Sequence, residues 1–207
     1  MRTRAAHLEA LDFLAGCRAE TLHLVRHVSQ AQLDTAPPSG GWSVGEVLSH
    51  LLIVEDKIRS QFALLVQLHD AGDRPELVWE FTANSTVPVW IPKELVPVMG
   101  PPFEIFNAIL PRQVAEYLIR FPVFRFRAAD WATPEKALEG DGLRSRLRGS
   151  LEQTRGVLES KPERPWEEFV VRHPSLGVNS VPQMLRIVGH HEHRHQQQIQ
   201  RILAGVG

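Results

Sequence analysis

The chain has a single cysteine, Cys17, among its 207 residues. One cysteine cannot form an internal disulfide, which fits a reducing compartment. The formal net charge is only −1, so there is no electrostatic reason to expect nucleic acid or an anionic membrane as a partner. No apolar run is long enough to span a bilayer, and the N-terminus lacks the apolar segment of a signal peptide. We therefore expect a soluble, cytoplasmic protein.

Several common enzyme motifs are also absent. The sequence has no Gly-x-Ser-x-Gly nucleophile motif, no glycine-rich Walker loop and no dinucleotide-binding fingerprint. The cysteine falls within an apolar helical pattern, which is more typical of a packed core thiol than of a nucleophile. These absences argue against serine hydrolases, P-loop enzymes and dinucleotide-dependent enzymes.

The chain has enough apolar residues to form one hydrophobic core. The hydrophobic content is 43%, so we expect a single domain over 1–207. The proline-rich stretch 73–102 has no sustained periodicity and is predicted to be an ordered but irregular insertion, and 165–178 is predicted to be a short irregular link. Elsewhere apolar residues recur at helical intervals, which predict helices over 5–30, 43–70, 103–129, 141–160 and 180–204.

Two of these helices carry clear start signals. Ser43 and Glu46 form a capping-box pattern at the start of the second helix. Asn179 or Ser180 caps the last helix, and Pro182 falls in its first turn. Long helices with mostly short links and no alternating strand patterns predict an all-α, up-down four-helix bundle that carries a long, irregular, proline-rich insertion.

The last helix carries a cluster of histidines. His191 and His195 are one helical turn apart and share the apolar stripe of this helix. By the same count His193 points to the opposite side and His190 lies on a flank. Imidazoles four residues apart can bind one transition-metal ion, whereas burying them without partners costs about 1–3 kcal/mol for each polar nitrogen. The pair alone leaves two interpretations open, a metal site and a pair of satisfied core histidines.

A further histidine, His50, borders the apolar stripe of the second helix. A single histidine in such a position is more often half-buried and bonded to a backbone carbonyl than bound to a metal. Its context adds information, because it follows a tryptophan-serine helix start and precedes a leucine and Glu55. The last helix adds an HxxxH pattern, and the link before it contains His173-Pro174.

In this order and at this separation, these motifs resemble the DinB-like (DinB/YfiT) family of bacterial four-helix-bundle metalloproteins. The likeness covers the chain from Trp42 to its end, with the middle supported only by the layout of the helices; the long insertion 73–102 departs from the family pattern. The resemblance implies that His50, His191 and His195 bind one divalent metal ion in a cleft of the bundle. Three histidines suit zinc, nickel or iron(II). It also implies a homodimer.

Three protein ligands leave coordination positions open, which is typical of a catalytic site. One interpretation is therefore a metal-dependent transferase or hydrolase that acts on a small molecule. For some members of the family, the resemblance implies chemistry that uses a low-molecular-weight thiol, either S-transfer or isomerisation. The alternative is a non-catalytic metal-binding or stress-associated dimeric bundle, and the sequence does not separate the two.

Two acidic residues near these histidines are left out of the predicted site. Glu192 completes a literal His-Glu-x-x-His zincin pattern, but it projects about 100° away from His191 around the helix. Glu46 is explained more simply by its capping box than by a catalytic role. The remaining prediction is geometric: the ring nitrogens of His50, His191 and His195 should approach within about 3–4 Å of each other, while His190 and His193 should not join them.

Overall fold

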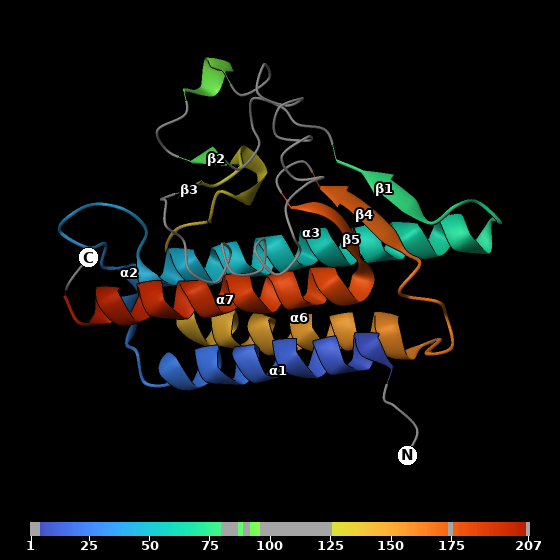
Figure 1. Cartoon of the computed structure of the whole chain (residues 1–207). Helices are drawn as coiled ribbons and strands as arrows, with labels where there is room; N and C mark the ends of the chain where they lie inside the picture. Colours follow the sequence, from blue (N-terminus) through green and yellow to red (C-terminus); the bar gives the residue numbers. More distant parts are fainter. Residues whose placement is uncertain (1–4, 80–86, 89–91, 96–125, 174–175, 206–207) are drawn as a thin grey trace.

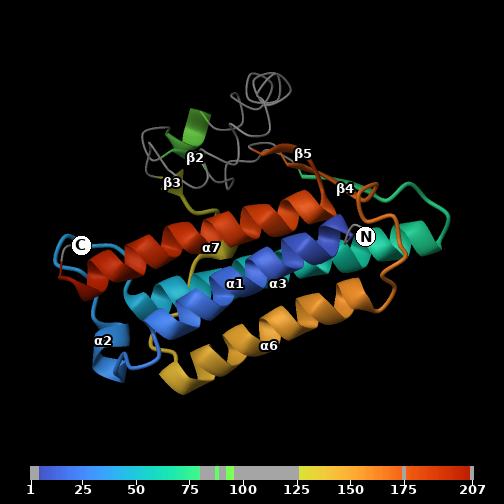
Figure 2. The same ribbon diagram turned by 60° about the horizontal axis from the view of Figure 1, so that its bottom comes forward.

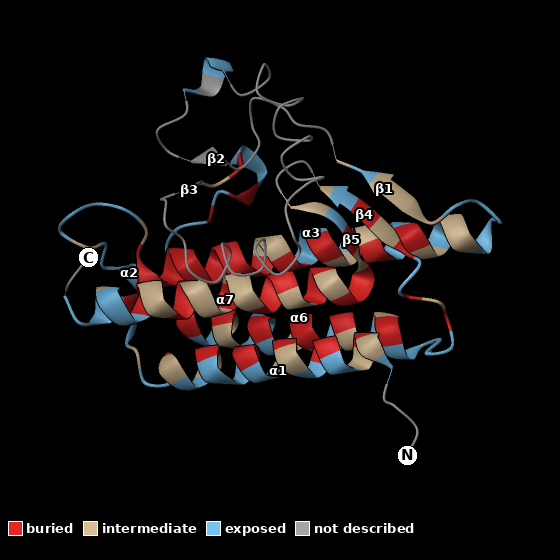
Figure 3. Cartoon of the chain, viewed as in Figure 1, coloured by how far each residue is buried: buried red, intermediate tan, exposed pale blue. Residues whose placement is uncertain are grey.

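The computed structural model describes residues 5–79, 87–88, 92–95, 126–173 and 176–205. Four long helices dominate this part of the chain, and their inward faces carry most of the buried residues (Figures 1 and 3). They are α1 (Ala6–Leu24), α3 (Val44–Asp70), α6 (Gly140–Glu159) and α7 (Val181–Leu203). Shorter helical segments are α2 (Gln30–Asp34), η1 (Lys93–Leu95) and η3 (Asp130–Ala132). The predicted all-α, four-helix-bundle architecture is confirmed.

The order of the helices around the bundle places α3 beside α7. Both α1 and α3 pack against α6 and α7. Neighbours α1 and α7 run in the same direction, as do α3 and α6, whereas α3 and α7 are antiparallel (Figures 1 and 2). The long segment between α3 and α6 makes this possible, because it returns the chain to the end of the bundle where α3 begins.

In the described part of the chain, no helix is long and apolar enough to cross a membrane.

Local hydrogen bonds fix where α3 and α7 begin. In α3 the Ser43 N–H donates to Glu46 Oε2 at 2.8 Å and the Glu46 N–H to Ser43 Oγ at 3.2 Å. This reciprocal capping box gives the predicted helix start. In α7 the Ser180 N–H donates to Gln183 Oε1 at 2.8 Å, and Pro182 lies in the first turn.

The prediction of one helix over 5–30 is wrong at its end. Helix α1 stops at Leu24, and Ser29 caps the separate helix α2. Arg144 of α6 donates to the carbonyls of Val25 and Val28 at 3.0 and 2.6 Å. These bonds tie the turn after α1 to α6, where the Val25 carbonyl also accepts from the Val28 N–H at 3.3 Å.

The link over 165–178 was predicted to be irregular, and this prediction is wrong. It contains β4 (Val170–His173) and continues into β5 (Gly177–Ser180), which pair antiparallel. Strand β1 (Glu76–Val78) adds to β4 in parallel and gives the sheet order β1-β4-β5. The stretch 73–102 therefore supplies one strand to this sheet, and its other described elements are short.

The predicted helix over 103–129 lies mostly outside the described residues. Its last residues, 126–129, are not helical, so the prediction is wrong there. Phe126–Arg127 form β3, which pairs antiparallel with β2 (Val87–Pro88). Helix α6, in contrast, matches the prediction over 141–160 closely.

The core has two apolar halves along the bundle. One half gathers around Phe62, Trp166 and Phe169, and the other around Leu33, Leu48 and Leu147. The described core also holds buried polar side chains, among them His50 and Glu192.

Helices α1 and α7 approach each other closely at Gly189. A Cβ built at Gly189 would lie only 2.6 Å from Cε1 of Phe13. Glycine therefore lets the Phe13 ring of α1 pack directly against the α7 backbone beside the histidine cluster.

Candidate metal centre

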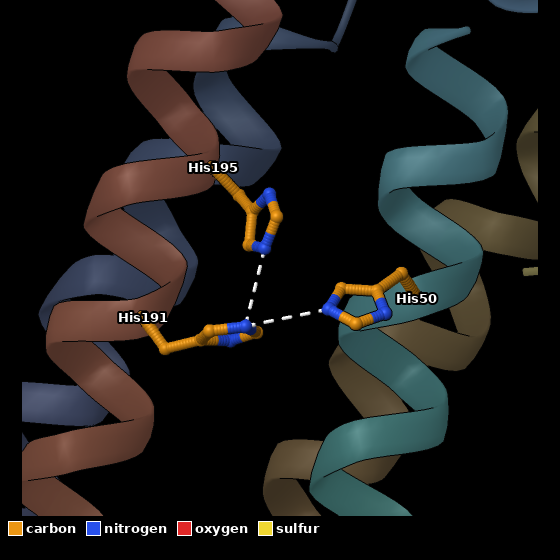
Figure 4. Close-up of side chains that lie close together, drawn as sticks. All are labelled: His50, His191 and His195. Atoms are coloured by element: carbon orange, nitrogen blue, oxygen red, sulfur yellow. Dashed lines mark hydrogen bonds between the residues drawn. The ribbon is translucent and has the colours of Figure 1, made fainter. Parts of the chain in front are cut away.

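Three imidazoles meet across the antiparallel pair α3 and α7. The Nε2 atom of His191 lies 3.3 Å from Nε2 of His50 and 3.1 Å from Nε2 of His195 (Figure 4). One ring nitrogen from each of the three residues lies within 4.8 Å of the other two. The structure therefore brings together the three residues that the sequence selected.

The outer nitrogens of two rings are held by acceptors. His50 Nδ1 lies 2.7 Å from the carbonyl oxygen of Ala132 in η3, and His195 Nδ1 lies 2.8 Å from Oε1 of Gln198. A carbonyl oxygen only accepts, so in both rings Nδ1 carries the hydrogen and Nε2 carries the lone pair. This is the arrangement in which protein histidines bind metals through Nε2.

The central ring, His191, differs from the other two. Its Nδ1 is buried and has no hydrogen-bond partner among the described residues. Its Nε2 faces the lone pairs of both other rings. Lone pairs that converge on one point at this distance repel unless a proton or a cation lies between them. Three neutral imidazole nitrogens are a donor set that fits a divalent transition metal.

The protonation states favour ligation. Burial lowers the pKa of His50, although the hydrogen bond to Ala132 opposes this shift. Burial, and then the neighbouring His195 and His50, hold the pKa of His191 well below its ordinary value. Burial lowers the pKa of His195 to about 3. All three rings are therefore neutral at pH 7, which is the form that binds metal.

Trp42 covers the histidine cluster at the start of α3. Its ring centroid lies 4.7 Å from that of His50 and 6.4 Å from that of His195. The indole thus packs against one ligand from each of the two helices. The sequence placed Trp42 in a helix-start motif but gave it no part in the site.

The other two histidines of α7 lie elsewhere. His190 packs against Phe13 of α1, with ring centroids 4.9 Å apart. His193 contacts Gln196, whose Oε1 lies 3.1 Å from its Nδ1. Neither belongs to a cluster of metal-ligating side chains in the described part of the chain. Helical periodicity therefore correctly distinguished His191 and His195, which join the cluster, from His190 and His193, which do not.

The structure removes the zincin interpretation. Glu192 is fully buried and accepts from Arg18 Nε and Nη2 at 2.8 and 3.0 Å. A carboxylate held in this way inside the bundle does not face the histidine cluster as a base. Glu46 is held in the capping box with Ser43, as the simpler interpretation required.

Two residues that orient the ligands were missed by sequence reasoning. Gln198 lies on the same stripe as His195 and three residues after it, so its role could have been read from the helix count. The role of the Ala132 carbonyl could not be predicted from the sequence. Every residue has a backbone carbonyl, and only the tertiary fold brings this one next to His50.

Two surface grooves are lined by described residues of α3 and α6 and of the segment before α6, and by none of α7. Each has a volume of about 530 Å³ and runs between α3 and α6. Their described lining includes Arg59 and Trp131 but none of the three histidines. The grooves therefore provide no substrate pocket for the metal centre.

Comparisons with known proteins agree with the four-helix fold. The model of the DinB superfamily matches residues 14–199. The solved structure of YfiT from Bacillus subtilis, described as "a probable metal-dependent hydrolase with an unusual four-helix bundle topology", is similar with a TM-score of 0.57 and 14% identity. That similarity covers 99% of this chain and 89% of YfiT. No curated protein matches the sequence.

Proposed function

Because the chain belongs to the DinB superfamily and three imidazoles converge between α3 and α7, we propose that it is a divalent-metal-dependent enzyme that acts on a small molecule. One observation carries the proposal. The Nδ1 atoms of His50 and His195 are held by oxygen acceptors, so their Nε2 lone pairs both point toward Nε2 of His191. One cation at this point would satisfy the Nε2 lone pairs of all three rings together.

In this proposal each residue has a defined task. His50, His191 and His195 hold the ion, and the Ala132 carbonyl and Gln198 fix two of the rings. Three protein ligands leave positions open for substrate. When bound, the metal supplies a Lewis acid, which activates water in hydrolysis or favours the thiolate form of a small thiol in S-transfer.

The finer proposal is that the substrate is a low-molecular-weight thiol. The chain does not supply this thiol itself. Cys17 is buried, and burial together with Glu192 raises the pKa of its thiol to about 11. A second molecule must therefore bring the sulfur, which is consistent with a site that has open coordination positions.

One observation favours a second candidate, a metal-binding bundle without turnover. In the part of the chain that the structure describes, no carboxylate or thiol joins the three histidines within 4.8 Å. The described residues thus supply ligands but no acid–base group directly among them. A bundle of this kind would bind the ion with the same residues and show no activity.

Metal analysis of the untagged protein tests the proposal. We expect one divalent ion per chain after equilibration with zinc, nickel or iron(II) and gel filtration. His50→Ala, His191→Ala and His195→Ala should each lose the ion, whereas the control His193→Ala should retain it. A wild-type protein that binds no ion would contradict the proposal. A screen of small thiols with the loaded protein then separates an enzyme from a non-catalytic bundle.

A further inference from the structure

A single arginine links all four helices of the bundle. Arg18 of α1 donates from Nε to Glu192 Oε1 at 2.8 Å and from Nη2 to Glu192 Oε2 at 3.0 Å on α7. The same Nη2 donates to Glu55 Oε2 at 2.8 Å on α3, and Nη1 donates to the Leu147 carbonyl on α6. Thr154 Oγ1 donates to the other oxygen of Glu55 at 3.0 Å. We call Arg18, Glu55 and Glu192 the arginine clamp.

The arginine clamp is fully enclosed by the bundle. The side chains of Arg18 and Glu55 are each 2% exposed and that of Glu192 is 1% exposed. Charged groups so deep in a protein are tolerated only when they are paired and hydrogen-bonded. Each member therefore has little freedom to move without leaving a partner uncompensated, and the helices that carry them are held in register.

The arginine clamp joins the same two helices as the histidine cluster. Glu55 comes five residues after His50 on α3, and Glu192 directly follows His191 on α7. At about 100° per residue, each carboxylate projects well away from the imidazole on its own helix. Helices α3 and α7 are thus connected twice, through the imidazoles on one side and through Arg18 on the other.

We propose that the arginine clamp is the positioning device of the metal centre: by fixing α3 against α7, it holds His50 within reach of His191 and His195 before any ion binds. This inference rests on the proposed function. It assigns a role to Glu192 that differs from the zincin base, and a role to Glu55 beyond its place in a motif. The three residues act through the histidines and do not themselves bind metal.

Two substitutions separate positioning from electrostatics. Glu55→Gln removes one link of the clamp together with a negative charge. Arg18→Lys keeps the charge but loses the planar fork that spans both carboxylates. The matched control is Asp70→Asn, which weakens another arginine–carboxylate contact of α3, made by Arg164 Nη2 at 2.9 and 2.8 Å, at the opposite end of the helix from His50.

Two measurements are made on each protein. The first is the zinc dissociation constant with the cobalt(II) absorption spectrum, which reports coordination geometry. The second is made without metal: NMR nuclear Overhauser contacts report whether the His50 ring stays against the rings of His191 and His195, whose centroids lie 5.2 and 5.0 Å away. Thermal unfolding of every variant is recorded beside them.

We expect Glu55→Gln and Arg18→Lys each to weaken zinc binding about 10-fold, the size typical when a partner of a metal ligand is lost. Both should alter the cobalt spectrum and weaken the contacts of the His50 ring with the other two rings in the metal-free protein, while Asp70→Asn changes only the unfolding temperature. A clamp that only stabilises the fold would lower the unfolding temperature and leave the spectrum and the ring contacts unchanged, and this would overturn the proposal. An effect of Glu55→Gln with none of Arg18→Lys would assign the result to charge and also overturn it.

The measurement without metal also separates the two proposals. If the wild-type protein binds no metal, the proposed function fails, and the ring contacts of the metal-free protein alone decide the inference. A Glu55→Gln variant that does not fold leaves Arg18→Lys to decide it in the same assays.

Discussion

The Nε2 atoms of His50 and His191 lie 3.3 Å apart, although 141 positions separate the two residues in the chain. Neither nitrogen can satisfy the other when both carry a lone pair, and the Ala132 carbonyl fixes the lone pair of His50. The contact exists because α3 and α7 are antiparallel neighbours with both histidines at the same level of the bundle. An ion at this point would link two helices that are distant in sequence.

Metal binding should therefore stabilise the fold. An ion that binds only the folded state at 100 times its dissociation constant contributes about 2.7 kcal/mol. We expect saturating zinc to raise the thermal unfolding temperature by several degrees and a chelator to reverse the rise. His191→Ala should abolish this response, and an equal rise in that variant would show that the ion binds elsewhere.

The hydrogen bond from His195 to Gln198 should tune metal affinity. Gln198→Ala removes the acceptor 2.8 Å from Nδ1, so the ring loses both its fixed tautomer and its orientation. We expect about 10-fold weaker zinc binding by calorimetry. Gln197→Ala is the control, because Gln197 contacts His193 rather than the cluster. Equal dissociation constants for the two variants would contradict this role.

Much of the bundle could be read from local sequence. The limits of α3 were predicted within one residue, because Ser43 and Glu46 form a capping box and Gly72 follows the last turn with a positive φ of 85°. The inward face of His191 and His195 also followed from helix periodicity alone. Such signals lie within a few residues of the feature that they determine.

Features that depend on distant partners were not accessible in this way. Strand β1 joins the strand pair β4–β5, and its Glu76 pairs with Val170 of β4. No local sequence pattern predicts that pairing. The meeting of His50 with the α7 pair was expected from the family resemblance, since periodicity does not say which helices are neighbours. The arginine clamp was missed for the same reason, because Arg18 and its partners come from different helices.

Cys17 should be inert in the folded protein. Its thiol is buried and its pKa is raised to about 11, chiefly by burial. At pH 8 the thiolate fraction is then about one in a thousand, and the thiolate is the reactive form. We expect iodoacetamide to modify Cys17 slowly in the native protein and rapidly in denaturant, as followed by mass spectrometry. Rapid native labelling would show that the α1–α7 contact opens.

The indole of Trp42 should report metal occupancy. Its centroid is 4.7 Å from that of His50, so a paramagnetic ion held by the three histidines lies close enough to quench its fluorescence. We expect nickel or cobalt to quench the wild-type emission, and Trp42→Phe to lose most of that change. Trp79→Phe is the control, since Trp79 packs against His173 instead. Quenching that persists in Trp42→Phe would place the ion elsewhere.

His7 should make the fold sensitive to acid. It is buried beside Trp166, neither ring nitrogen has a hydrogen-bond partner among the described residues, and burial lowers its pKa below 6.5. Below pH 6.5 the unfolded chain takes up a proton that the folded ring resists, so stability is full above this pH and falls as the pH drops toward the folded pKa. The three metal-site histidines add to the same loss without metal. We therefore expect the unfolding temperature of His7→Leu to fall less than that of the wild type when the pH is lowered from 7 to 5. Parallel losses in the two proteins would show that His7 accepts a proton in the folded state as readily as in the unfolded one.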